Sequence, residues 1–114
     1  MMNKPKKRPS LVVGIGASAG GVQQLQAFFS KVNPNSKAAY IVVQHLSQNN
    51  RSYMPELLQN QTSLKVCVAE DLSLLEASTV YMIPPGTVLT VENLRLRIRA
   101  RSSANEVYHP VDNL

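Results

Sequence analysis

The sequence has no tryptophan, few aromatic residues and a single cysteine, Cys67. A lone cysteine excludes a disulfide within the chain, and no cysteines and histidines cluster with the spacing of a metal site. Within Lys65-Val66-Cys67-Val68-Ala69 we interpret Cys67 as a small strand residue. Hydrophobic runs are far shorter than a membrane span, and residues 1–4 lead into no signal-peptide core. We expect a cytoplasmic protein with no metal, no cofactor and no membrane insertion.

Acidic residues are missing from the chain before Glu56, although seven cations precede it. A net charge of +5 distributed so unevenly favours an acidic partner. Residues 1–9 are interpreted as a basic flexible leader, and the alternative is that the cations form a basic rim around an active site. Nucleic acid is not expected as a partner, because no aromatic or groove-reading element accompanies the charges. The cations before Glu56 are Lys4, Lys6, Lys7, Arg8, Lys31, Lys37 and Arg51.

The segment 11–21, LVVGIGASAGG, has the pattern of a buried strand, a glycine turn and the start of a helix. Its residues 16–20 fit the G-x-S-x-G nucleophile elbow, in which small residues let the chain turn sharply and expose the serine oxygen. Ser18 is therefore a candidate nucleophile. The backbone N–H groups of Ala19 and Gly20 are candidate donors for an oxyanion.

A serine nucleophile requires a base, and His45 is in the right place to supply one. Apolar residues at helical spacing follow the elbow up to Phe29, and a near-continuous apolar run, residues 38–43, then predicts a parallel strand covered on both faces. His45 comes just after this strand. Carboxyl ends of neighbouring parallel strands lie at one edge of a sheet, so we expect Ser18 and His45 to share that edge.

A dinucleotide-binding site is the alternative function that the sequence leaves open. Gly14, Gly16 and Ala19 match G-x-G-x-x-G/A between a strand and a helix. A NAD site normally has an acidic residue about 20 positions further on, and this chain has none there, although Arg51 suits a NADP phosphate. The motifs therefore favour serine chemistry over a Rossmann-like module that uses GIGASA.

The second half of the chain is dominated by strand patterns. A helix start is predicted over residues 52–58, and short strands over 64–69, 79–83, 87–91 and 94–100. Glu92-Asn93 suits the turn of a hairpin between the last two strands. In the last strand Arg95, Arg97, Arg99 and Arg101 alternate with apolar residues, which predicts one solvated face. The fold class is α/β, a Rossmann-like doubly wound, mostly parallel sheet with a C-terminal β-hairpin.

The residues resemble a known family at four places in the same order. Segments 13–21 (VGIGASAGG), 41–46 (IVVQHL), 81–86 (YMIPPG) and 109–112 (HPVD) are similar to the catalytic domain of the CheB protein-glutamate methylesterases of chemotaxis. The resemblance implies that Ser18 is the nucleophile and His45 the base in hydrolysis of glutamyl methyl esters, with deamidation of glutamine as a second activity. It implies methyl-accepting chemotaxis receptors as partners and a methyltransferase module, fused or separate. The early order of serine then histidine does not fit an α/β-hydrolase.

One catalytic residue of that family has no match here. Its aspartate lies well C-terminal to the segment that resembles 109–112, and Asp112 belongs to that earlier segment. Residues 10–114 are therefore interpreted as the N-terminal part of a methylesterase catalytic domain, truncated and nearly inactive alone. A carboxylate from Asp71, Asp112 or a glutamate bonded to His45 would contradict this expectation.

Overall fold

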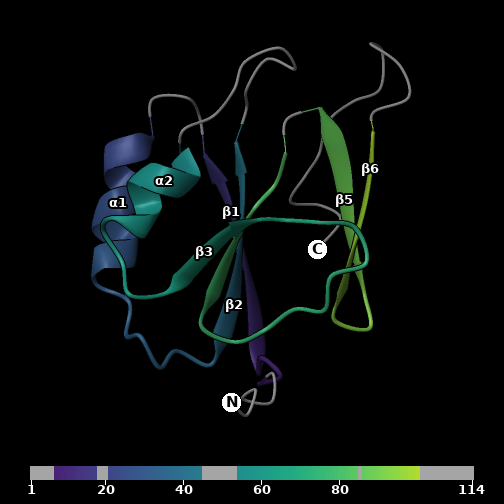
Figure 1. The fold of residues 1–114 in the computed structure, drawn as a ribbon, viewed down its shortest axis with the longest axis horizontal. Coiled ribbons are helices and arrows are strands. Elements are labelled where there is room, and N and C mark those ends of the chain that lie inside the picture. The colour runs from purple at the N-terminus through teal and green to yellow at the C-terminus, as the bar shows by residue number, and fades with distance from the viewer. Residues whose placement is uncertain (1–6, 18–20, 45–53, 85, 101–114) are drawn as a thin grey trace, which may run out of the picture.

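The protein forms three layers around a four-stranded parallel sheet (Figure 1). The computed structural model describes residues 7–17, 21–44, 54–84 and 86–100. The sheet has the order β1-β2-β4-β3, two helices cover one face, and an antiparallel hairpin covers the other. Its strands are β1 (Leu11–Ala17), β2 (Ala38–Gln44), β3 (Lys65–Val68) and β4 (Thr79–Met82); the helices are α1 (Val22–Ser30) and α2 (Met54–Gln59); the hairpin is β5 (Thr87–Glu92) and β6 (Arg95–Ala100). The Rossmann-like, mostly parallel sheet and its hairpin are confirmed.

β2 is the centre of the core, as its apolar run predicts. Every side chain from Ala38 to Val43 is buried. Because alternate side chains of a strand point to opposite faces, Tyr40 and Val42 pack with the helices, whereas Ile41 and Val43 pack under the hairpin. A strand covered on both faces has no need for polar residues, which explains the unbroken run.

The helix side of the core is built on an aromatic cluster. Phe29 of α1 is fully buried, and its ring meets the Tyr40 ring edge-on at a centroid distance of 5.4 Å. The Tyr40 hydroxyl is 2.8 Å from the hydroxyl of Ser36, so the buried phenol keeps a polar partner. Phe28 belongs to the same apolar pattern but is 46% exposed.

The predicted hairpin is present, with its turn one residue later than Glu92-Asn93. Glu92 pairs with Arg95, so Asn93 and Leu94 form the turn, and their φ angles are 51° and 63°. Positive φ at both central positions gives the twist that a two-residue hairpin requires, and an asparagine tolerates it better than a glutamate does. Leu89 and Leu96, which are fully buried, anchor the hairpin to the sheet.

The arginine row of β6 is solvent-exposed over its described part, as predicted. Arg95, Arg97 and Arg99 are exposed, and Leu96 between them is fully buried. Arg97 forms exposed ion pairs with Asp71 at 3.9 Å and with Glu92 at 3.7 Å. Such pairs contribute little energy, so the row mainly keeps this face of the hairpin solvated. Arg101 lies outside the described residues.

β1 is less buried than the sequence predicts. The strand forms where predicted, but it occupies an edge of the sheet among the described strands, so the prediction of a buried strand is wrong. Its side chains are half-buried or exposed, and Leu11 is 60% exposed. The apolar sequence could not reveal this position, because a strand's burial depends on neighbours distant in the chain.

The opposite edge of the sheet, β3, is covered by a side chain. The amide of Gln59, the last residue of α2, accepts a hydrogen bond from the Val66 N–H at 2.9 Å and donates one to the Leu64 carbonyl at 2.8 Å. Gln59 thus bonds the outer edge of β3 much as a neighbouring strand would. The exposed Lys65 adds a charge to the same edge.

We predict that Gln59→Ala lowers the free energy of unfolding by about 1 kcal/mol, because the Val66 N–H and the Leu64 carbonyl lose their partner. Urea denaturation followed by circular dichroism measures the change. Gln23→Ala, at an exposed position of α1, is the matched control and is expected to have little effect. Equal losses in the two variants would show that the Gln59 contacts contribute nothing.

Candidate active site

The carboxyl ends of β1 and β2 lie side by side, and each directly precedes one of the two predicted catalytic residues. The strands are parallel and in register from Leu11 opposite Ala38 to Ala17 opposite Gln44. Neighbouring strands lie about 4.8 Å apart, so the chain leaves β1 and β2 at the same height, at the carboxyl end of the sheet. Ala17 directly precedes Ser18, and Gln44 directly precedes His45. Ser18, Ala19, Gly20 and His45 themselves lie outside the described residues, and their roles remain predictions.

The helix that follows the elbow motif begins at a glycine, which has no side chain to cap it. Gly21 is the N-cap of α1, its carbonyl accepts the N–H of Leu25 at 3.0 Å, and none of the described side chains caps the first turn. The first turn contains no acidic residue either. Within the described residues of this turn, no side chain neutralises the positive end of the helix dipole, which favours negative charge near Gly21.

An apolar groove of about 540 Å³ is lined in part by Ala17 and Gly21, the described residues on either side of residues 18–20. It lies between the outer edge of β1 and the exposed side of α1, where Phe28 forms part of its wall. No charged side chain lines the groove. Its lining residues are Val13, Ile15, Gly16, Ala17, Gly21, Gln24, Leu25 and Phe28.

The described cations of the first half do not surround this site. Lys7 and Arg8 precede β1, Lys37 precedes β2, and Lys31 is the C-cap of α1, so all four lie at the amino-terminal end of the parallel strands. A hydrogen bond of 2.9 Å from the Ser10 N–H to the Lys37 carbonyl joins two of these segments. The basic rim is therefore not formed by these residues, because the register of β1 and β2 places them one strand length from Ala17.

Asp71, one of the carboxylates considered as a partner of His45, is bonded to the hairpin. Its carboxylate accepts a hydrogen bond from the Ile98 N–H at 2.7 Å, in addition to its ion pair with Arg97. Asp71 thus fastens the loop after β3 to the hairpin. Asp112, the other aspartate weighed from the sequence, lies outside the described residues.

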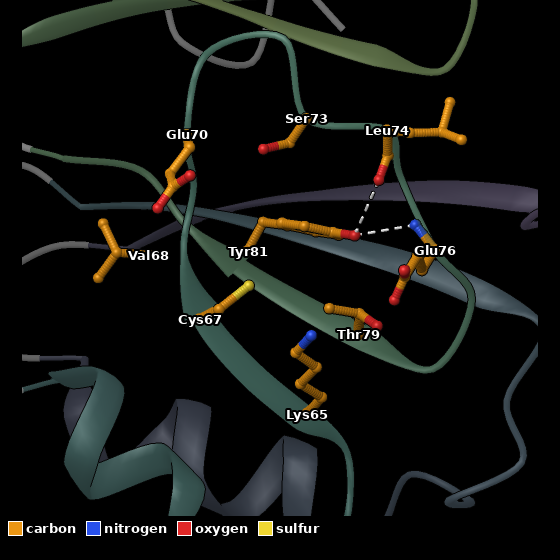
Figure 2. A pocket seen from close by; sticks show the side chains of 9 residues that line it. All are labelled: Lys65, Cys67, Val68, Glu70, Ser73, Leu74, Glu76, Thr79 and Tyr81. Atoms are coloured by element: carbon orange, nitrogen blue, oxygen red, sulfur yellow. Dashed lines mark hydrogen bonds between the residues drawn. The ribbon is translucent and has the colours of Figure 1, made fainter. Parts of the chain in front are cut away.

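A second cavity, of about 250 Å³, lies on the hairpin side of β3 and β4 (Figure 2). The Cys67 thiol lies 3.8 Å from the carbonyl of Val80. The Tyr81 hydroxyl accepts the Glu76 N–H at 2.8 Å and makes a longer contact, 3.5 Å, with the Leu74 carbonyl. No motif in the sequence indicates this cavity, because its walls come from β3, β4 and the loop between them.

Burial raises the pKa of the Cys67 thiol, and the positive charge of Lys65 only partly opposes the shift. Burial likewise raises the pKa of Tyr81. Both groups stay protonated at neutral pH, so Cys67 lacks the thiolate that a nucleophile or metal ligand needs. Among the described residues no cluster of histidine, cysteine and carboxylate side chains could hold a metal ion.

We predict that alkylation of Cys67 by iodoacetamide reaches its half-maximal rate at a higher pH than alkylation of free cysteine. A raised pKa means that less thiolate is present at any pH below the transition. Mass spectrometry over a pH series, with glutathione as the control, measures the two profiles. A Cys67 profile at or below that of glutathione would contradict the burial argument.

Neither described helix is long and apolar enough to cross a membrane. α1 has nine residues and α2 has six.

Comparison with known proteins gives concordant results for most of the chain. A family model described as CheB methylesterase matches residues 13–114. A protein-glutamate methylesterase/protein-glutamine glutaminase of Saccharophagus degradans is 36% identical over 98 residues, which is 83% of this chain and 27% of that protein. One of Burkholderia orbicola is 32% identical over 108 residues, 95% of this chain and 30% of that protein. The chain thus spans less than a third of the length of these curated relatives.

A solved structure agrees with the fold. The crystal structure of the Thermotoga maritima CheB methylesterase catalytic domain superimposes with a TM-score of 0.68 at 26% sequence identity. The match covers 81% of this chain and 50% of that one. The likeness therefore concerns half of the solved domain.

Proposed function

The chain belongs to the CheB methylesterase family, and from this premise we propose that it carries the nucleophile and the base of a protein-glutamate methylesterase. The substrates are glutamyl methyl esters on chemotaxis receptors, and glutamine side chains are the alternative substrate. Ser18 is the nucleophile and His45 is the general base. The receptors, a methyltransferase module and a cytoplasmic location belong to the same proposal.

The register of β1 with β2 is the single observation that carries the proposal. Ala17 and Gln44 are directly opposite one another, and each is followed by one of the two proposed catalytic residues. Had β1 and β2 been separated by another strand, Ser18 and His45 would leave the sheet about 10 Å apart, too far for direct proton transfer. Adjacent pairing supports a serine–histidine pair.

The reaction proceeds through an acyl-enzyme. His45 takes the proton from the Ser18 hydroxyl while the serine oxygen attacks the γ-carbonyl carbon of the ester. The tetrahedral intermediate then collapses, the bond to the methoxy oxygen breaks, and His45 returns the proton so that methanol leaves. Water then attacks the acyl-serine while His45 takes a proton from it; the bond to the serine oxygen breaks, His45 returns the proton to Ser18, and the glutamate is released. With glutamine as substrate, ammonia leaves in place of methanol.

The start of α1 suits the negative charge that develops on the carbonyl oxygen. The proposed donors are the backbone N–H groups of Ala19 and Gly20, which come just before Gly21, the N-cap of the helix. With no acidic side chain in the first turn, the helix dipole acts on the oxyanion without local compensation.

A carboxylate that orients His45 completes such a site. Asp71 is engaged with Ile98 and Arg97, which argues against this role, and the family's aspartate has no matching position among residues 1–114. In a serine protease, loss of the aspartate's function lowers kcat by about 10⁴. We therefore propose that the chain alone retains acylation by activated esters and hydrolyses receptor methyl esters very slowly.

We predict that p-nitrophenyl acetate transfers one acetyl group to Ser18, because an activated ester needs less help from the base than a methyl ester does. Peptide mass spectrometry locates the acetyl group. Ser18→Ala is expected to abolish the modification, and His45→Gln to slow it at least about tenfold. The control Ser30→Ala changes an exposed serine at the far end of α1 and is expected to leave acylation unchanged. Undiminished labelling in Ser18→Ala would remove Ser18 from the mechanism.

We predict that NAD and NADP leave the melting temperature unchanged at millimolar concentration. A ligand bound to Gly14, Gly16 and Ala19 in the folded state would raise the melting temperature by mass action. Differential scanning fluorimetry measures the shift. A saturable increase would contradict the esterase proposal and favour a dinucleotide-binding module.

A further inference from the structure

Two cavities adjoin one another at the amino-terminal end of the parallel strands, the end opposite Ala17. The larger, of about 530 Å³, lies between the segments that precede β1, β2 and β4. The smaller, of about 170 Å³, lies between the segment before β1 and the turn of the hairpin. In Figure 1 the starts of β1 and β2 and the turn of the hairpin all lie at the lower end of the molecule. Lys7 and Arg8 line both cavities, which we therefore describe together as the basal groove; its other lining residues are Asn35, Ser36, Lys37, Ala77 and Ser78 in the larger cavity, and Leu74, Leu75, Asn93 and Leu94 in the smaller.

The walls of the larger cavity are fastened to one another. Its three wall segments come from distant parts of the sequence, and each is bonded to the other two, so the backbone holds the groove in a fixed shape. Walls that are already in place reduce the ordering that a bound partner must impose. The three hydrogen bonds run from the Ala77 N–H to the Lys7 carbonyl at 2.9 Å, from the Ser10 N–H to the Lys37 carbonyl at 2.9 Å, and from the Ser78 hydroxyl to the Ser36 carbonyl.

The basal groove is positively charged. Lys7, Arg8 and Lys37 line it, and none of the described acidic residues does. No ion pair between two described residues includes any of these three cations. Glu76, which directly precedes the wall residue Ala77, lines the cavity beside Cys67 instead. Cations gathered on one concave surface attract an anionic partner.

One end of the basal groove is apolar. Leu74, which is 36% exposed, and the half-buried Leu94 lie there beside Lys7 and Arg8. Figure 2 shows that the Leu74 side chain points away from the Tyr81 hydroxyl and the cavity beside Cys67. A partner that covers these leucines would remove apolar area from water. The groove therefore offers charge along most of its length and an apolar contact at one end.

We propose that the basal groove binds an acidic segment of a partner protein, a short run of aspartate or glutamate residues followed by an apolar side chain. The carboxylates face Lys7, Arg8 and Lys37, and the apolar side chain covers Leu74 and Leu94. Complementary charge of this kind speeds association and selects the partner. This proposal does not rest on the proposed catalytic function, because the groove and the Ala17 end of β1 lie at opposite ends of the sheet.

The shape and charge of the groove favour a polypeptide over other occupants. A compact phosphate ligand would fill part of the larger cavity and leave the leucines at the other end uncovered. A second copy of this chain would bring its own net charge of +5 to a basic surface. An extended acidic segment can reach both cavities at once.

Fluorescence anisotropy tests the site with a dye-labelled peptide, a run of glutamates that ends in leucine. We expect saturable binding of one peptide per chain, and weaker binding at high salt because the cations are exposed. A peptide with glutamine in place of each glutamate is the matched control and is expected not to bind. Amide shifts in NMR spectra locate the peptide, with the largest changes expected at Ser36, Ala77 and Leu94. None of these measurements depends on Ser18.

Variants that each remove one positive charge distinguish the groove from the charge of the whole chain. Arg8→Gln and Lys37→Gln are expected to raise the Kd about fivefold or more, because each removes a charged contact. Lys31→Gln changes an exposed lysine at the same end of the molecule but outside the groove, and is expected to change the Kd less than about twofold. Leu74→Ala is expected to weaken the peptide that ends in leucine and to leave one that ends in glycine unchanged. Circular dichroism verifies the fold of each variant.

Three results would overturn the proposal. The first is an absence of saturable binding. The second is an equal rise of Kd in Lys31→Gln and Arg8→Gln, which would show general attraction between opposite charges. The third is displacement of the peptide by tripolyphosphate at concentrations below the peptide's own Kd, which would identify the groove as a site for a small phosphate ligand.

Discussion

The parallel pairing of β1 with β2 is the constraint on which the rest of this structure depends. It requires a crossover that returns the chain to the same end of the sheet, and α1 provides it by packing Leu25 and Phe29 onto the β2 side chains. The level ends of the two strands, Ala17 opposite Gln44, follow directly from this pairing. Any serine and histidine chemistry at the carboxyl ends of these strands therefore depends on the backbone hydrogen bonds between β1 and β2.

β2 stabilises both faces of the molecule at once. Tyr40 and Val42 contribute to the core beneath the helices, and Ile41 and Val43 to the core beneath the hairpin. A large-to-small change in this strand would leave a cavity that neither layer can readily fill. The hairpin is held to the sheet by Leu89 and Leu96, which are fully buried, and to the loop after β3 by the Asp71 carboxylate.

The two ends of the parallel sheet differ in charge. Lys7, Arg8, Lys31 and Lys37 gather at the amino-terminal end of the strands, whereas the groove at the carboxyl end is lined by uncharged residues. At that end the helix dipole of α1, whose first turn holds no acidic residue, adds partial positive charge. An acidic substrate approaching this chain would thus meet strong positive charge and the start of α1 at opposite ends of the molecule.

Local patterns in the sequence by themselves determined the elements. The apolar run before His45, the helical spacing before Phe29 and the alternation around Leu96 identify strand, helix and hairpin, because each reflects the period of its own backbone. The elbow motif and its order relative to His45 likewise indicated the family. The tertiary structure alone decided that β1 lies at an edge, that Gln59 covers the opposite edge, that Cys67 borders a cavity, and that the described cations lie far from Ala17. These properties depend on which strands become neighbours, and neighbours in a parallel sheet are brought together by residues far apart in the chain.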